Sequence, residues 1–137
     1  MSLPLHSPLR WTAAVMLLAT AATHIPLVPE HLEEAPYIGV LFVVLSVASL
    51  ALAVVVVVRD TPLVWGVTGV MSLLAVVAFV ASRTVGLPQI GDDVGNWTDP
   101  LGPPALAAET LAFVAAAVVL RTDAHRRHTR PRRAVTS

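Results

Sequence analysis

The sequence contains no cysteine and no lysine, and it is poor in charged residues of either sign. Without cysteine, the chain has no disulfide, no thiolate zinc or iron–sulfur site and no cysteine nucleophile. All nine basic residues are arginine, which together with the abundance of alanine and valine indicates codon bias in a high-GC bacterium. Only 13% of the 137 residues are charged, about half of the ~25% that is usual in soluble domains. The composition therefore argues against a water-soluble domain.

Hydrophobic residues make up 55% of the chain, and they occur in long uncharged blocks. Such blocks are typical of helices surrounded by lipid. Capping-type residues precede a proline at Pro8, Pro36, Pro62 and Pro100, and proline is tolerated in the first turn of a helix. The sequence predicts an all-α fold, a four-helix transmembrane bundle in residues 1–120, with spans at about 8–25, 36–58, 62–84 and 104–120.

Pro26 is expected to end the first span, which leaves two longer connections on one side of the bundle, residues 26–35 and 85–103. Both are expected to be ordered outer loops. The second is dense in proline and glycine, which impose turns without a helix, and its Leu87, Ile90 and Trp97 are expected to lie on the bundle as a lid. The connection on the other side is very short, so the second and third spans are expected to form a tight antiparallel hairpin.

The first span is also compatible with a signal peptide. Arg10 would be its charged region, residues 11–18 its apolar core and residues 19–21 its cleavage site. Against this alternative, the hydrophobic run continues past the cleavage site to Leu27.

Arginine placement predicts the orientation in the membrane. Every arginine except Arg83 lies in the N-terminus, the second connection or the C-terminus, all on one side of a four-span chain. By the positive-inside rule both termini are cytoplasmic, in the inner membrane of a bacterial cell. Residues 121–137 are then an Arg-rich tail that rests on anionic headgroups; its arginines are Arg121, Arg126, Arg127, Arg130, Arg132 and Arg133. Nucleic acid is not an expected partner, whereas a membrane-protein partner or a second copy remains open.

Three ionisable residues lie within the spans, His24, Arg83 and Glu109, all towards the outer face. Ionisable groups inside a membrane are costly and rarely lack a purpose. We expect Arg83 and Glu109 to form a buried ion pair that holds two helices in register, with His24 as a hydrogen-bond partner. The sequence indicates no reaction and no cofactor. It favours a non-enzymatic accessory or binding component of the membrane.

Two alternatives use the same residues. The first is a zinc or copper site, because imidazole and carboxylate groups suit these metals, although the spacing matches no established motif. The second is proton- or cation-coupled transport through Glu109, against which the second and third spans carry no midplane charge and no interrupting proline. The ligands expected for the metal alternative are His24, Glu30, His31, Glu34 and Glu109.

Three segments carry a resemblance to known proteins: residues 31–39, residues 82–88, and the run from Trp97 to Glu109. Together they resemble small four-span membrane proteins of actinobacteria, over most of residues 10–120. The resemblance implies that the polar residues of the outer face belong to one recurring module. It supplies no active residues.

Overall fold

The computed structural model describes residues 5–129, which form helices and connecting turns without a strand. The elements are α1 (Leu9–His24), η1 (Ile25–Leu27), α2 (Val28–Glu34), α3 (Pro36–Arg59), α4 (Pro62–Thr84), η2 (Gly91–Asp93) and α5 (Gly102–Thr129). Four helical stretches are long and apolar enough to cross a membrane: Leu9–Glu34, Pro36–Arg59, Pro62–Thr84 and Gly102–Thr129. The predicted all-α fold with four apolar spans is therefore confirmed.

The α-helix of the first span, α1, ends at His24, close to its predicted end, but the chain does not enter a loop there. The chain continues past Pro26 as the short 3-10 helix η1 and then as α2, and it leaves the helical conformation only at Ala35. Pro26 and Pro29 each occupy the first turn of one of these short helices, where a missing N–H has no partner to lose. The expected loop at residues 26–35 is thus largely helical, and His24 lies within a continuous helical stretch.

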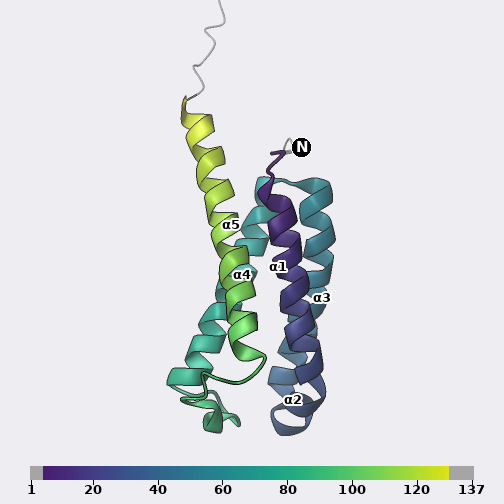
Figure 1. Ribbon diagram of the computed structural model, residues 1–137, viewed down its shortest axis with the longest axis vertical. Coiled ribbons are helices and arrows are strands. Elements are labelled where there is room, and N and C mark those ends of the chain that lie inside the picture. The colour runs from purple at the N-terminus through teal and green to yellow at the C-terminus, as the bar shows by residue number, and fades with distance from the viewer. Residues whose placement is uncertain (1–4, 130–137) are drawn as a thin grey trace, which may run out of the picture.

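The four long helices run side by side, and the starts of α1 and α4 lie at the same end of the bundle as the basic part of α5 (Figure 1). We call this the termini end and the opposite one, where α2 and η2 lie, the α2 end. Helix α1 packs against α3 and α5, and α4 packs mainly against α5.

The tight hairpin expected of α3 and α4 is not formed, because these two helices touch over only a short stretch. Asp60 adopts a left-handed conformation and Thr61 an extended one, which turns the chain away from α3. The small residues of α4 instead approach α5. A Cβ atom placed on Gly69 would lie 3.2 Å from the Cβ of Ala116.

The core of the bundle consists of two apolar clusters, one near each end. The cluster at the α2 end is small, with Ala35, Ile38 and Ile90 at its centre. The cluster at the termini end is larger and contains Ala13, Ala14, Leu17, Ala53, Val56, Trp65, Ala115, Ala116 and Val119. Between the clusters the buried side chains are mostly polar, and this middle layer holds the candidate site.

The connection between α4 and α5 folds over the α2 end. Gly86 and Gly95 adopt positive φ angles of 81° and 82°, which a glycine reaches without steric cost. The Tyr37 hydroxyl donates to the Pro88 carbonyl at 2.6 Å, which ties the connection to the start of α3. Ile90 is buried, with Leu87 beside it. The predicted ordered lid is thus confirmed for these two side chains.

Candidate functional site

His24 of α1 and Glu109 of α5 meet inside the bundle. The Nε2 atom of His24 lies 3.6 Å from Oε1 of Glu109, and the Glu109 side chain is only 2% exposed. Glu109 is seven residues from the start of α5 at Gly102, about 10 Å along the helix axis. A carboxyl group at this depth is costly unless its charge is neutralised or paired. Of the three expected cluster residues, the structure therefore brings together His24 and Glu109.

The hydrogen bond on the far side of the imidazole fixes its orientation. Nδ1 of His24 lies 2.8 Å from the carbonyl oxygen of Thr20. Because a carbonyl oxygen only accepts, Nδ1 carries a hydrogen, and Nε2 is the atom presented to Glu109. The Phe42 ring stands edge-on to the imidazole, with centroids 4.8 Å apart.

The 3.6 Å contact is longer than a hydrogen bond, but it is short enough for charge to favour a single proton on the pair. A bare Nε2 facing a carboxylate would place two lone pairs against each other. A proton on both groups would leave a positive charge buried without a counter-ion. One proton, on either Nε2 or Oε1, makes the contact attractive and keeps the pair neutral as a whole. The pair is therefore suited to hold and transfer one proton.

Arg83 does not pair with Glu109, so the expected Arg83–Glu109 ion pair is wrong. Its guanidinium contacts the Asp93 carboxylate at 2.7 Å and the Asp99 carboxylate at 3.2 Å, and it lies over the Phe79 ring. Both aspartates are about a quarter exposed, so pairing with them costs less desolvation than pairing with the buried Glu109. Arg83 thus fastens the connection between α4 and α5 over the α2 end.

The ligand set expected for a metal is not assembled. Within residues 5–129, no three side chains of histidine, aspartate or glutamate lie close enough to hold a metal ion. The helical conformation of α2 leaves Glu30 and Glu34 exposed. Nδ1 of His31 is engaged with the Leu27 carbonyl at 2.9 Å, and the Phe42 ring contacts both imidazoles.

Buried hydroxyl groups continue the polar layer from the pair towards the termini end. The side-chain oxygens of Ser46, Ser49 and Thr68, and Oε1 of Glu109, find no hydrogen-bond partner within residues 5–129. An unpaired buried polar group costs about 1–3 kcal/mol, so four of them would cost roughly as much as the whole stability of a domain, about 5–15 kcal/mol. These oxygens are therefore costly to bury without polar partners beyond those that residues 5–129 supply.

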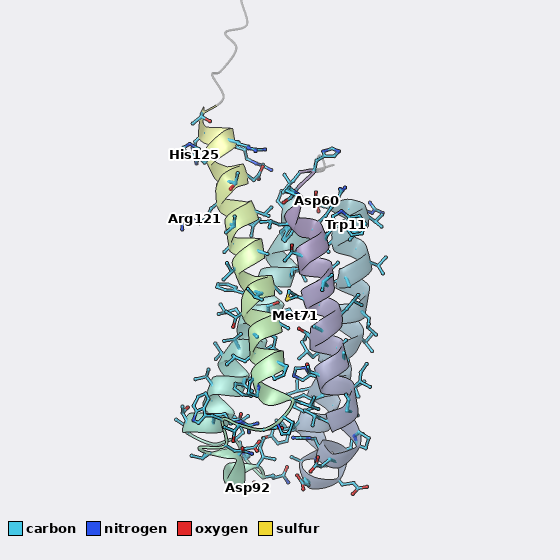
Figure 2. The ribbon with its side chains drawn as sticks, viewed as in Figure 1. Trp11, Asp60, Met71, Asp92, Arg121 and His125 are labelled. Atoms are coloured by element: carbon cyan, nitrogen blue, oxygen red, sulfur yellow. The ribbon has the colours of Figure 1, made fainter. Side chains whose placement is uncertain are left out.

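Asp60 is a polar centre that the sequence analysis did not identify. It is 1% exposed, and its carboxylate accepts hydrogen bonds from the Ser7 backbone N–H and the Trp65 indole N–H, both at 2.7 Å. Arg10 lies 3.8 Å from the same carboxylate. Figure 2 shows Asp60 at the start of α1, far from Asp92 at the opposite end. Aspartate tolerates the left-handed conformation that Asp60 adopts. An aspartate in this short connection was the one indication of the polar centre in the sequence.

The expected membrane-surface arginines lie on the last part of α5, which extends past the start of α1 (Figures 1 and 2). Arg121, Arg126 and Arg127 are exposed, and Arg127 pairs with Asp123 one turn earlier at 2.8 Å. Arg130, Arg132 and Arg133 lie outside the described residues.

Comparison with known proteins adds no further constraint, because no protein-family model, curated protein or solved structure matches the chain. The function is therefore argued from the geometry of this chain.

Proposed function

We propose that the chain is a non-enzymatic membrane protein that binds and releases one proton at the His24–Glu109 pair. The observation that carries the proposal is the contact between Nε2 and Oε1, with Nδ1 held by Thr20. A buried pair with a single proton between its members is neutral in one arrangement and an ion pair in the other. Loss or gain of a proton changes the net charge of the pair inside the bilayer. Because a buried charge is costly, this change alters the energy of the bundle.

The surroundings of the pair support a ligand as small as a proton. The two best-defined hollows on the described part of the chain lie between residues 5–9 and α5 and along the outer side of α4. Neither is lined by His24 or Glu109. A substrate of ordinary size would need a cavity beside the reacting groups.

The helices around the pair carry few other ionisable side chains near it. Helix α3 carries no ionisable side chain between Tyr37 and Arg59. On α4 the nearest one is Arg83, which is engaged with Asp93 and Asp99. His31 of α2 lies close enough to His24 for their charges to interact, and the Phe42 ring of α3 packs against both imidazoles. A change of protonation is therefore expected to involve the pair and, through its charge, His31.

The proposal is tested by infrared spectroscopy of the full chain in lipid bilayers as the pH is varied. A carboxyl C=O band that changes with pH is expected in the wild-type protein and is expected to vanish in Glu109→Gln. Glu34→Gln is the matched control, because it makes the same chemical change on an exposed residue. If the titrating carboxyl band is unchanged in Glu109→Gln, the pair does not exchange a proton and the proposal fails.

We also propose that the termini end faces the cytoplasm of a bacterial inner membrane, with α2 and η2 on the outer side. Arg10, Arg59 and the arginines of α5 lie at the termini end, whereas Glu30, Glu33, Glu34 and Asp92 lie at the α2 end. This asymmetry is the positive-inside pattern, and anionic headgroups are the proposed partners of the α5 arginines.

The absence of cysteine makes this orientation straightforward to test with single substitutions. In intact cells, Asp92→Cys is expected to react with a membrane-impermeant maleimide, and Thr129→Cys only after the cells are opened. The reverse pattern would contradict the orientation.

A further inference from the structure

Two unpartnered oxygens of the middle layer, those of Ser46 and Ser49, have a spacing that suits a bridging water molecule. These residues are three apart on α3, which corresponds to a step of about 4.5 Å along the helix axis. One water molecule bridges two oxygens up to about 5.6 Å apart, because each of its hydrogen bonds is about 2.8 Å long. A single water therefore fits between the hydroxyls of Ser46 and Ser49.

The helices present these hydroxyls to the interior of the bundle. Ser46, Ser49, Thr68 and Ser72 are all at most 4% exposed, although hydroxyls on helices often bond to a carbonyl of the preceding turn instead. Thr84 and Ser82 of α4 do so, donating to Val80 and Phe79 at 2.7 Å. The oxygens of Ser46, Ser49 and Thr68 have no such bond.

The layer is closed towards the termini end. Leu17, Val56 and Trp65 are completely buried there, and they belong to the larger apolar cluster. The single polar atom of the Trp65 side chain is already used in the hydrogen bond to Asp60. No polar group of these three side chains is left to continue a chain of hydrogen bonds from Thr68.

We infer that the middle layer holds a short chain of water molecules that starts at Oε1 of Glu109, passes Ser46 and Ser49, and ends at Thr68 below Trp65. This inference rests on the proposed function, for which it supplies the hydration of the pair: the waters solvate Glu109 when its proton moves. Such a buried water is ordinarily held by two to four polar groups, which the hydroxyls and backbone carbonyls of this layer supply. The chain of waters stops at the apolar cluster, so it does not cross the bundle.

Solid-state NMR of the full chain in lipid bilayers tests the inference through the rate at which magnetisation passes from water to each residue. We expect Ser46, Ser49 and Thr68 to receive it several-fold faster than Leu17 and Val56. Thr68→Val, which keeps the shape and removes the hydroxyl, is expected to slow the transfer to Ser49. Thr84→Val is the matched control and is expected to leave it unchanged. Equal, slow transfer at the serines and at Leu17 would overturn the inference.

The outcome separates the inference from the proposed function. If the hydroxyls are dry while the Glu109 band still titrates, the water chain is wrong and the proton-binding pair stands. If the hydroxyls are wet and no Glu109 band titrates, the pair fails and the water chain stands.

The closed end has its own test. Liposomes that contain the wild-type chain are expected to hold an imposed pH difference as long as protein-free liposomes do. A proton leak that Thr68→Val abolishes would show that the path continues past Trp65, and the closed end would be wrong.

Discussion

Trp65 donates its indole N–H to a carboxylate oxygen of Asp60 over 2.7 Å, and both side chains are almost completely buried. The same carboxylate accepts the backbone N–H of Ser7, and the Asp60 carbonyl accepts that of Leu5 at 2.8 Å. One residue thus holds the end of α3, the start of α4 and the segment before α1 together. This hydrogen bond lies at the termini end of the bundle, whereas the His24–Glu109 pair lies in the middle layer.

Replacing Asp60 with asparagine is expected to destabilise the protein by about 1.5–3 kcal/mol, the usual value of a hydrogen bond to a charged group. The amide NH2 would face a donor, either Ser7 or Trp65, that the carboxylate now accepts. Thermal unfolding in detergent measures the loss. Asp123→Asn is the control, because its pair with Arg127 is exposed and within one helix, and such pairs contribute about 0.3–0.5 kcal/mol. Equal effects of the two substitutions would contradict the role given to Asp60.

Arg83→Gln is expected to release the connection between α4 and α5. The guanidinium is 6% exposed and contacts both Asp93 and Asp99. Since both aspartates are about a quarter exposed, its loss is expected to cost less than the ~3–5 kcal/mol of a fully buried pair. Hydrogen–deuterium exchange should rise in residues 85–101 while the exchange of α1 and α3 stays low. Arg121→Gln removes an exposed guanidinium and should change neither region. Unchanged exchange at 85–101 in Arg83→Gln would show that other contacts hold the connection.

Two glycines within helices should respond to alanine in opposite directions. A Cβ on Gly39 of α3 would lie 2.7 Å from the backbone nitrogen of Leu32, whereas one on Gly66 of α4 would meet nothing within 4 Å. Gly39→Ala is expected to separate α2 from α3 at a cost of at least the 1–3 kcal/mol that is roughly typical of overpacking. Gly66→Ala should be neutral or stabilise by up to about 1 kcal/mol, since alanine favours a helix. The comparison is made by thermal unfolding, and a larger loss for Gly66→Ala would contradict the packing of α2.

The helices could be predicted because hydropathy and proline mark them locally. Pro36 and Pro62 begin α3 and α4 since each supplies the first turn with a residue that needs no N–H partner. Pro26 ends α1 as predicted, but it also occupies the first turn of η1, so the expected loop does not follow it. A proline that interrupts an α-helix also begins a 3-10 turn readily, and only tertiary packing of α2 on α3 decides between an end and a continuation.

The contacts of the site depended on information that is not local. The sequence indicated His24, Arg83 and Glu109 but not their partners, because Arg83 reaches Asp93 and Asp99 only through the fold of the connection after α4. The hydroxyl layer left a usable trace, since Ser46 with Ser49 and Thr68 with Ser72 have the spacing of one helix face.

The central claim is that His24 and Glu109 share one proton, and the signals of the imidazole nitrogens show where that proton lies. Solid-state NMR of the full chain with 15N-labelled histidine in lipid bilayers distinguishes protonated from bare ring nitrogens, and His24→Asn identifies the signals. We predict that Nδ1 of His24 carries a hydrogen throughout, and that the signal of Nε2 changes in Glu109→Gln but not in Glu34→Gln. A His24 ring with a bare Nδ1, or an Nε2 signal indifferent to Glu109, would contradict the account.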